Sequence, residues 1–428
     1  MLSHRRHLSR RKRQALCPSW GTVIGGQVGE HQGSGSASRL DRIKWWAAFA
    51  LAVFAVHSIP FFQYPPGDLA YYVQPWYRHI IAYGRVQVFA EPFSNYTPPY
   101  LYLLSLTTLL YGVMALVYQI KLLAIAGALW IVYASCKLFD ALGAPRWGAF
   151  GILILPSIVF NTSLLGQADT FWVAPCVLSL AASIRERWFW VAFWSGLAFA
   201  FKAQAVFFAP FVVYLFLRNR VPLRHWLVPI GVYVAAMLPA WLVGWPAWDL
   251  AAVYFQQVHE PLLAQFVSDS ASWWTLFGYT AKSLALKSFW FGFLTAAIGV
   301  VAYCYYLPRL TGAALVAAAV IATAGLPFLL PGMHERFFIL ADVLAFLYAY
   351  LRPSRNSIIA AVLMQLASAL PVAAWAFRFQ HGEVCAPFFA VGALLIFWQE
   401  IAGSPEMKRN SSPPAKEYAQ IPIPEQAP

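Results

Sequence analysis

Nine polar side chains stand out because they interrupt or adjoin long apolar runs of the sequence. Charged groups at membrane depth are energetically expensive and are therefore functional candidates by default. Two of the nine are acids in the first long polar loop, and the others form three short groups near the ends of apolar runs. In chain order they are Asp68, Glu91, Gln167, Asp169, Lys202, Gln204, His334, Glu335 and Arg336.

These residue types fit the transfer of a group from a phosphate-linked donor. A leaving phosphate needs fixed cations, for which Lys202, His334 and Arg336 are candidates, and an arginine can bind it through two parallel hydrogen bonds. An acceptor hydroxyl needs a carboxylate within hydrogen-bond reach to take its proton. Asp68 is the candidate for this general base. A single carboxylate base with a separate anion-binding set fits direct displacement with inversion, because a phosphate leaves without an acid.

Each candidate also has a purely structural explanation. Asp68 follows a Pro-Pro-Gly turn and Asp169 precedes an apolar run, so either side chain can cap a helix. Arg336 can instead extend its charge to the lipid headgroups. His57 lies inside the first apolar run, where we expect it to be hydrogen-bonded rather than to act as a ligand.

The composition predicts the element type that must position these residues. The chain is 60% hydrophobic and 11% charged, against about 25% charged residues in soluble domains, and its mean hydropathy is +0.59. Apolar runs of membrane-spanning length indicate an all-α, polytopic helical membrane protein. The apolar runs cover 45–62, 99–118, 121–139, 147–164, 170–184, 188–201, 204–217, 226–244, 288–307, 311–330, 337–351, 357–377 and 386–401.

The placement of positive charge predicts the orientation. Residues 1–44 contain nine Lys/Arg and two acids, a net charge of +7, and read as a disordered cytoplasmic tail facing anionic lipids. From residue 137 onward, basic residues occur in alternate gaps between the apolar runs, as the positive-inside rule expects. This pattern places the N-terminus in the cytoplasm of a plasma (inner) membrane and all nine candidates on the outer face. Nucleic-acid binding is the poorer explanation of the overall charge of +13.

The number of crossings does not follow directly from the number of runs. Thirteen full crossings cannot leave both ends in the cytoplasm, and the runs 99–118 and 121–139 meet with almost no loop between them. We therefore expect 99–118 to be interfacial or re-entrant, a form tolerated where protein covers it. The expected architecture is about 12–13 transmembrane helices.

The membrane domain is expected to cover 45–402, with outer loops at 63–98 and 245–287. The first loop contains an amphipathic pattern over Leu69–Tyr83 that predicts a short interfacial helix. The second loop should form one or two further amphipathic helices, and the tail 403–428 is expected to be disordered. The predicted apolar face of the first-loop helix consists of Leu69, Tyr72, Trp76 and Ile80.

Several of these features together resemble a known superfamily. An early acid in the first outer loop, a later Tyr-x-Pro-Pro-Tyr, a Gly-Gln-Ala-Asp at 166–169, a Lys-Ala-Gln at 202–204 and a Met-His-Glu-Arg-Phe-Phe at 333–338 resemble the GT-C multi-spanning glycosyltransferases. The nearest pattern is that of bacterial mannosyltransferases related to the glycosylphosphatidylinositol mannosyltransferases. The resemblance implies a hexosyltransferase that uses a polyprenyl-phosphate sugar, with Asp68 as base and the donor phosphate near Lys202, His334 and Arg336.

The implied partners are a lipid-linked sugar donor, a glycan or lipid acceptor of the cell envelope, and membrane lipids. No cofactor is expected. Many members of the resembled group have a second acid two positions after the first, but Ala70 stands there, which leaves a divalent metal open. The alternative function is a transporter or flippase of a lipid-linked saccharide, which should show inverted repeats and broken helices. The five cysteines show no paired spacing, and Asn161 begins a glycosylation-type triplet of the kind common by chance.

Overall fold

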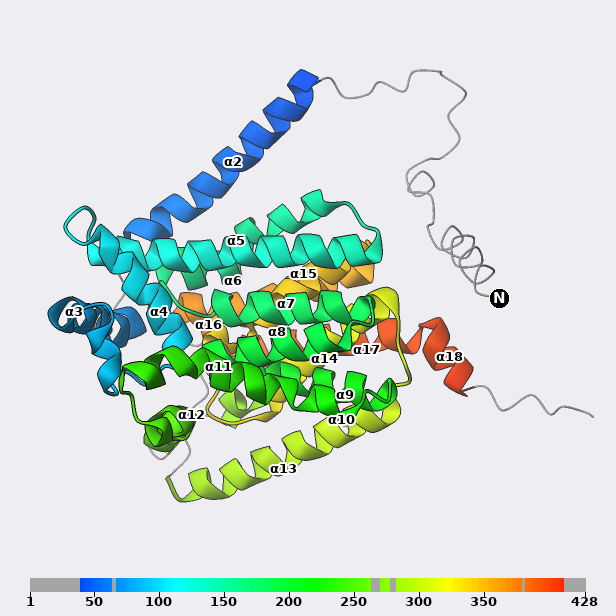
Figure 1. The fold of residues 1–428 in the computed structure, drawn as a ribbon. Coiled ribbons are helices and arrows are strands. Elements are labelled where there is room, and N and C mark those ends of the chain that lie inside the picture. The colour runs from blue at the N-terminus through cyan, green and yellow to red at the C-terminus, as the bar shows by residue number, and fades with distance from the viewer. Residues whose placement is uncertain (1–38, 64–66, 263–269, 278–281, 379–381, 412–428) are drawn as a thin grey trace, which may run out of the picture. The chain divides into compact units, whose positions relative to one another are not determined.

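The computed structural model describes residues 39–63, 67–262, 270–277, 282–378 and 382–411. All regular structure in these ranges is helical (Figure 1). The chain divides into two units, Met1–Leu51 and Ala52–Pro428. The boundary lies inside α2 (Arg39–Phe62). Everything below concerns the second unit.

Six helices among the described residues are long and apolar enough to cross a membrane, and a seventh span results if one bent pair counts as one. The prediction of an all-α chain with several membrane-spanning helices is confirmed; the predicted total of 12–13 remains a prediction. Four shorter apolar helices accompany them: Thr170–Ile184, Trp188–Phe201, Ala203–Arg218 and Trp290–Tyr306. The six candidate spans are Ile43–Phe62, Leu116–Leu142, Leu223–Val243, Gly312–Leu329, Arg355–Phe377 and Glu383–Ala402.

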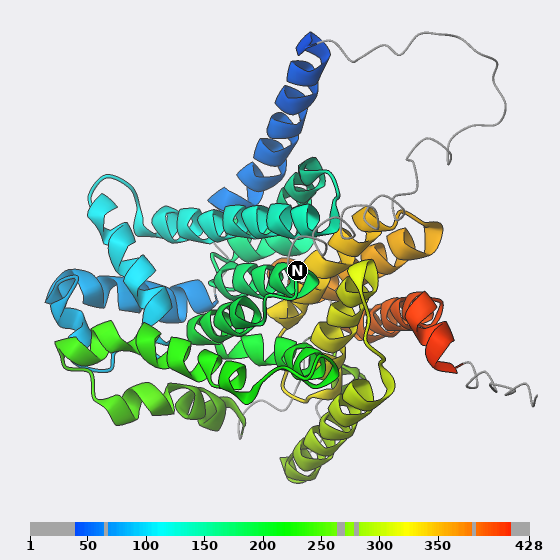
Figure 2. The same ribbon diagram turned by 45° about the vertical axis from the view of Figure 1, so that its right-hand side comes forward.

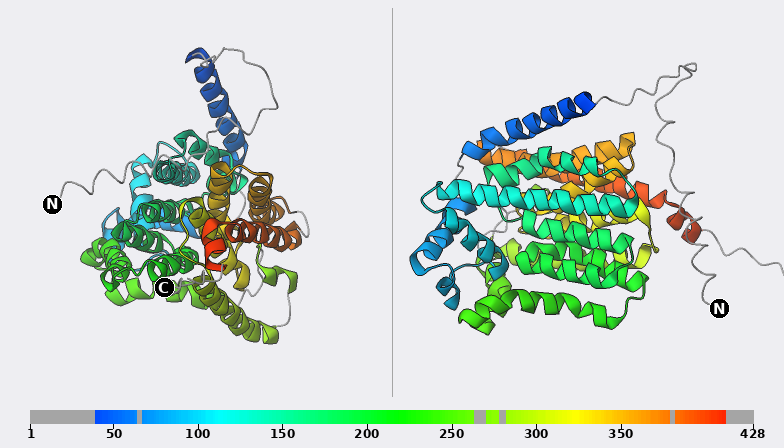
Figure 3. Two further views of the ribbon diagram at one scale, coloured as in Figure 1. Left: turned by 90° about the vertical axis from the view of Figure 1, so that its right-hand side faces the viewer. Right: turned by 45° about the horizontal axis from the view of Figure 1, so that its top comes forward.

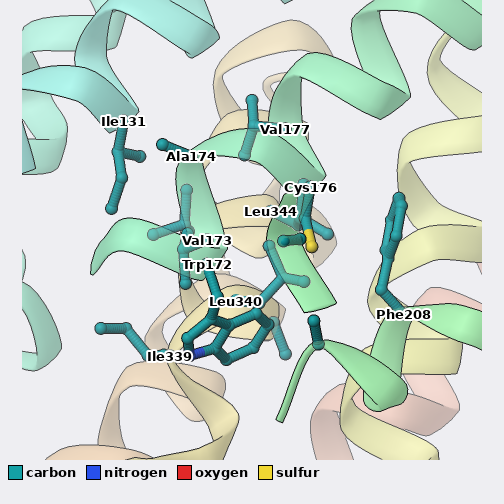
Figure 4. Packing of buried hydrophobic residues seen from close by; sticks show 14 of the residues in the cluster. Ile131, Trp172, Val173, Ala174, Cys176, Val177, Phe208, Ile339, Leu340 and Leu344 are labelled. Atoms are coloured by element: carbon teal, nitrogen blue, oxygen red, sulfur yellow. The ribbon is translucent and has the colours of Figure 1, made fainter. Parts of the chain in front are cut away.

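The centre of this unit is α7 (Thr170–Ile184), in which nearly every side chain is buried. It packs against α5 (Leu116–Leu142) and α8 (Trp188–Phe201). Trp172 and Val173 of α7 lie between Ile131 of α5 and Leu340 of α15, and Phe208 lies to one side (Figure 4). The surrounding helices are α14 (Gly312–Leu329), α15 (Ile339–Leu351), α16 (Arg355–Phe377) and α17 (Ala386–Ala402). A buried Trp172 on a helix without polar faces fits a helix surrounded by other helices.

The long helices run alongside one another in alternating directions (Figures 1 and 2). Alternate connections consequently gather at opposite ends. At one end, Arg309 forms an ion pair with Glu186 at 2.7 Å, and Tyr348 donates to Glu400 at 2.9 Å. At the other end lie α3 (Gln74–Tyr83), α4 (Pro98–Thr107) and α12 (Ala247–Leu262), which the right-hand view of Figure 3 also shows together. The candidate residues belong to this second end.

The first-loop helix forms as predicted, in two parts. A π-helical turn η1 (Leu69–Val73) leads directly into α3. Leu69, Trp76 and Ile80 are buried as expected. Tyr72, which was placed on the same apolar face, is 47% exposed. The π-turn adds residues per turn and rotates the helix, and the buried positions become Val73 and Tyr77 instead.

Residues 99–118 do not form one continuous helix. α4 has ten residues, which at 1.5 Å each gives about 15 Å, half of a bilayer's hydrocarbon thickness. The chain then turns through η3 (Thr108–Leu110) before α5 begins. This geometry fits the expectation that this run does not cross.

The other polar segments are partly described. In the second outer loop the chain forms α12 and η7 (Trp273–Phe277), while 263–269 and 278–281 lie outside the described residues. The expectation of disorder after residue 403 fails for α18 (Pro405–Ser411), a short helix that begins at a proline and has Lys408 and Arg409 in its last turn, both favourable positions. The rest of that tail and most of 1–44 lie outside the described residues.

The remaining elements are η2 (Gln87–Ala90), η4 (Arg146–Ile154), α6 (Pro156–Val159), η5 (Phe160–Leu164), η6 (Ala203–Phe208), α9 (Ala209–Arg218), α10 (Leu223–Trp226), α11 (Val228–Val243), α13 (Lys282–Tyr306), η8 (Glu335–Phe338) and η9 (Gly382–Cys385).

Candidate functional site

A linked set of charged side chains joins four segments at the end of the helices that carries α3. Asp68 precedes η1, Asp169 precedes α7, Lys202 follows α8, and Arg336 lies in η8. Arg336 Nη2 contacts Asp68 Oδ2 at 2.6 Å, and Lys202 Nζ contacts Asp169 Oδ1 at 2.7 Å. The two pairs are connected, because Arg336 Nε lies 3.7 Å from Asp169 Oδ2. The sequence placed these four residues at one site, and the structure brings them together.

The Asp169–Lys202 pair is fully buried. The side chains of Lys202 and Asp169 are 3% and 0% exposed. Asp169 receives two further hydrogen bonds, from Asn161 Nδ2 at 3.0 Å and from Trp172 Nε1 at 3.1 Å. Lys202 lies over the ring of Tyr96, with Nζ 5.2 Å from the ring centroid, an arrangement that stabilises a cation. Buried charges persist only when they are paired and hydrogen-bonded in this way.

The electrostatics of this pair keep both groups charged. Burial acts to raise the pKa of Asp169, but Lys202 and Arg336 together outweigh it and hold that pKa below its ordinary value. Burial likewise acts to lower the pKa of Lys202, and Asp169 outweighs it, so that pKa is raised. The Lys202 ammonium is paired with Asp169 at 2.7 Å and so helps to fix that acid. Its role as a phosphate contact stays a prediction.

Asp68 has very different surroundings. Its side chain is 31% exposed, and its other described polar neighbour is Gln167, whose Nε2 lies 3.5 Å from Oδ2. It occupies the N-cap position of η1 but makes no capping hydrogen bond. Asp169 likewise makes no capping bond to α7. The capping explanation therefore accounts for neither acid.

Arg336 is the residue that unites the site. Its side chain is 13% exposed, which contradicts the alternative in which it extends to the headgroups. Besides Asp68 and Asp169, its Nη1 contacts Glu335 Oε1 at 3.3 Å. Three carboxylates thus surround one guanidinium, and the five charges of the site, including Lys202, sum to −1. The burial of Arg336 opposes its charge, but the acids outweigh this effect and raise the pKa of Arg336.

Local backbone geometry explains why these residues meet. Between α6 and α7 the chain forms the π-helical η5 and then a turn at Gly166, whose φ is +61°, a value that glycine adopts without strain. This turn positions Gln167 and Asp169 at the site. On the opposite side, Thr97 donates to the carbonyl of Ala200 at 2.7 Å. That bond ties the first outer loop to the end of α8, immediately before Lys202.

The remaining candidates lie at the edge of the site or outside it. Glu91 is exposed, and no contact described in the structure connects it with Arg336. Gln204 is half-buried. His334 is 44% exposed and lies 3.9 Å from Glu335. Partial burial and the nearby Arg336 hold the pKa of His334 below its ordinary value. A lowered pKa disfavours the charge that the predicted role of His334 as a fixed cation requires, and that role stays a prediction.

Sequence reasoning missed three contributors, namely Asn161, Trp172 and Tyr96. Asn161 was noted only as a glycosylation-type triplet, but its side chain is buried and bonded to Asp169. A polar residue inside the apolar run 147–164 was the signal that could have identified it. His57 behaves as expected: its Nδ1 contacts Ser163 Oγ at 2.5 Å, and its Nε2 contacts the carbonyl of Leu153 at 2.8 Å.

Within the described part of the chain, no three His, Cys, Asp or Glu side chains form a group that could hold a metal ion. Comparison with protein-family models gives no match to this chain, and comparison with curated proteins gives none either.

Proposed function

We propose that this chain is an integral-membrane hexosyltransferase that transfers a sugar from a polyprenyl-phosphate donor to a glycan or lipid acceptor, with inversion. The observation that carries the proposal is the pair of unlike carboxylates joined by Arg336. One, Asp169, is buried and locked to Lys202 at 2.7 Å, and the other, Asp68, is 31% exposed at the surface of the site. When two acids have environments this different, the accessible one suits proton transfer and the buried one suits positioning.

The ion pair between Asp68 and Arg336 supports a simple order of events. A donor phosphate competes with Asp68 for Arg336 Nη2, because a guanidinium binds either anion through the same N–H groups. Binding of the phosphate frees Asp68 Oδ2. The freed carboxylate accepts the proton of the acceptor hydroxyl as its oxygen attacks the anomeric carbon, and the phosphate leaves with the bonding electrons. Donor binding would thus activate the base.

The aromatic surroundings fit a sugar bound next to a lipid surface. Tyr96 lies over Lys202, and its ring centroid is 4.9 Å from that of Trp76, which in turn lies 6.1 Å from that of Tyr72. Tyr72 is half exposed. Amphipathic aromatic rings of this kind are typical of the membrane interface. The proposal accordingly places the site at the outer surface of the plasma membrane, with the N-terminus in the cytoplasm.

Asp68→Asn tests the proposal directly. Asparagine keeps the shape and can still accept a hydrogen bond from Arg336, but it cannot take a proton. Since general-base assistance contributes about 10²–10⁴-fold to a rate, we expect transfer from a mannosyl-phosphate polyprenol to fall by that factor. The measurement is transfer of labelled sugar in membranes with matched protein levels.

Glu91→Gln is the matched control, because Glu91 is an exposed acid of the same loop. We expect it to retain most of the activity. An Asp68→Asn variant with near-native turnover would remove Asp68 from the mechanism.

The transporter alternative has one observation in its favour. The helices Arg146–Ile154 and Pro156–Leu164 meet at an angle of 59°, and broken helices are common in secondary transporters. A flippase would move a lipid-linked saccharide across a vesicle bilayer and leave its mass unchanged. Mass spectrometry of lipids from proteoliposomes separates the two functions.

A further inference from the structure

A small cavity lies beside Arg336, which forms part of its lining. The volume open to the centre of a water-sized sphere is about 10 Å³, which is room for one small particle. Its polar lining comes from Ser157 in α6, Asn161 in η5, Asp342 in α15 and Ser368 in α16, with Glu335 and Arg336 of η8 at one wall. Arg336 therefore belongs both to this cavity and to the proposed transfer site, whereas Ser157, Asp342 and Ser368 have no role in the proposed transfer.

The lining carries oxygen atoms that have no partner. Asp342 is fully buried, and its carboxyl group lies within reach of the hydroxyls of Ser157 and Ser368, although none of these oxygens makes a hydrogen bond of good geometry. Asn161 Oδ1 also lacks a hydrogen-bond donor among the described residues. Each unpaired buried polar group costs about 1–3 kcal/mol, and an ionised one costs more. Five such oxygen atoms around one cavity therefore indicate that a bound ligand satisfies them.

The backbone at the cavity is irregular in two of the four segments that line it. Ser157 follows the 59° bend between the helices Arg146–Ile154 and Pro156–Leu164, and Asn161 lies in a π-helical turn. In a third, α16, Pro371 provides no N–H for the carbonyl of Ala367, the neighbour of Ser368. π-turns occur frequently at functional sites. Interrupted helices within membranes are also a recurrent way to build cation sites, because they turn oxygen atoms inward.

We propose that this cavity binds one sodium ion, held by the Asp342 carboxylate, the hydroxyls of Ser157 and Ser368, and Asn161 Oδ1. The oxygen-only lining excludes metals that prefer nitrogen or sulfur. Calcium takes six to eight oxygens, and magnesium retains several waters, for which this cavity is too small. A single carboxylate balances one positive charge, so a monovalent ion fits beside Arg336.

The charge of the neighbourhood favours a cation. The site contains Asp68, Asp169 and Glu335 opposite Lys202 and Arg336; an ionised Asp342 brings the sum to −2. One bound sodium ion reduces this sum to −1 and neutralises the acid that lacks a partner. The ion site is argued separately from the proposed transfer reaction, since none of its four proposed ligands is assigned to the sugar, the phosphate or the base.

The test is thermal unfolding of the full-length protein in lipid nanodiscs, followed by tryptophan fluorescence at constant ionic strength. Sodium chloride replaces choline chloride stepwise, with potassium chloride as the parallel series. Ligand linkage predicts that sodium raises the Tm by roughly 2 °C for each tenfold increase above its Kd. Binding of radioactive sodium should give one ion per chain.

Asp342→Asn should abolish the sodium-dependent shift and the bound ion, and Ser368→Ala should weaken sodium binding by about tenfold or more. Asp140→Asn is the matched control, because Asp140 is an acid paired with Arg146 away from the cavity; it should retain the full shift. If Asp342→Asn does not fold, the loss of sodium affinity in Ser368→Ala still tests the proposed site. The Asp68→Asn protein should keep the sodium response whether or not it transfers sugar, so the two proposals fail separately.

Equal Tm values in sodium, potassium and choline for the unmodified protein would overturn the proposal, and would mean that Asp342 is protonated or binds a water molecule. A sodium response that survives in Asp342→Asn would also overturn it, since the ion would then bind elsewhere.

Discussion

At the scale of single residues, the site contains one acid that is held rigidly and one that is accessible, which suits the proposed division between a positioning role and a reactive one. Asp169 accepts from Lys202, Asn161 and Trp172, and this leaves it little freedom to move or to change its protonation state. Asp68 has Arg336 as its main partner and is open to solvent on one side. Arg336 is held by both acids. Its guanidinium consequently has a fixed direction before any ligand arrives, and preorganised charge of this kind is effective in transferring charged groups.

Removal of Lys202 should damage the fold more than it alters donor binding. Lys202→Met leaves the Asp169 carboxylate buried without its main counter-charge, and breaking a buried ion pair from one side costs about 3–5 kcal/mol. We expect a marked decrease in Tm, with the surviving folded protein retaining its donor KM. Thermal unfolding and transfer kinetics of the same preparation provide the measurement.

The double variant Lys202→Met/Asp169→Asn is the control for that experiment, because it removes both charges together. It should recover much of the lost stability. A single Lys202→Met variant with native Tm and a raised donor KM would instead support direct contact between Lys202 and the donor phosphate.

Residue type alone was enough to predict which residues belong to much of this site. It was not enough to predict which of these residues contact one another. Charged residues adjoining apolar runs indicated Asp68, Asp169, Lys202 and Arg336, because membrane burial makes such residues expensive. The partner of each depended on the packing of segments far apart in the sequence. Asp169 and Lys202 are 33 positions apart, and hydropathy contains no information about which acid meets which base.

At the scale of elements, helix ends position the site more than helix centres do. The end of α2 is held by Lys121 of α5, whose Nζ donates to the carbonyls of Pro60, Phe61 and Gln63 at 3.2, 2.9 and 2.5 Å. These are carbonyls of the kind that remain unpaired at a helix C-terminus, and a lysine there also interacts favourably with the helix dipole. This contact fixes the chain a few residues before Asp68.

Lys121→Met should therefore loosen the entry to the first outer loop. The carbonyls of Phe61 and Gln63 lose the Lys121 donor, while that of Pro60 keeps a hydrogen bond from the backbone N–H of Gln63; a hydrogen bond to a charged group contributes about 1.5–3 kcal/mol. We expect a lower Tm, faster proteolysis within 63–68 and reduced transfer. Lys137→Met on the same helix is the control, because Lys137 contacts only the ring of Tyr133 among the partners described. Equal proteolysis in the two variants would contradict the positioning role of Lys121.

Apolar periodicity predicted where helices occur, but it could not predict their irregularities. The helix over Leu69–Tyr83 was correctly located, yet the π-turn at its start moved Tyr72 out of the buried face. The bend after Ile154 and the π-turn η5 also lay within one apolar run, 147–164. Hydropathy measures the environment along a run, and an interrupted helix buried against its neighbours has the same environment as a straight one.

At the scale of the whole molecule, the alternating helix directions sort the charges to two ends. The end opposite the site carries a larger share of the basic residues in short connections, and the positive-inside rule therefore predicts that it is the cytoplasmic end. At the site end, Lys202 and Arg336 form ion pairs with Asp169 and Asp68. These two cations are therefore balanced by acids, unlike most basic residues of the opposite end. The basic connections of the opposite end contain Arg146, Arg185, Arg187, Arg218, Arg220, Arg224, Arg309, Arg352 and Arg355.

Orientation can be measured with reporter fusions at the two ends. A fusion after Arg220, between α9 and α10, and one after Arg352, between α15 and α16, should report the cytoplasm, because both junctions belong to the basic end. A fusion after Gly332, between α14 and η8, should report the exterior. A phosphatase reporter active only outside the membrane and a fluorescent reporter that folds only inside provide opposite readouts at each junction. Arg336 lies four positions after Gly332, so the fusion after Gly332 reports the side of the membrane on which the site lies. If the fusion after Arg220 reported the exterior instead, the whole site would face the cytoplasm. The proposed enzyme would then have to bind its donor and its acceptor on the cytoplasmic face.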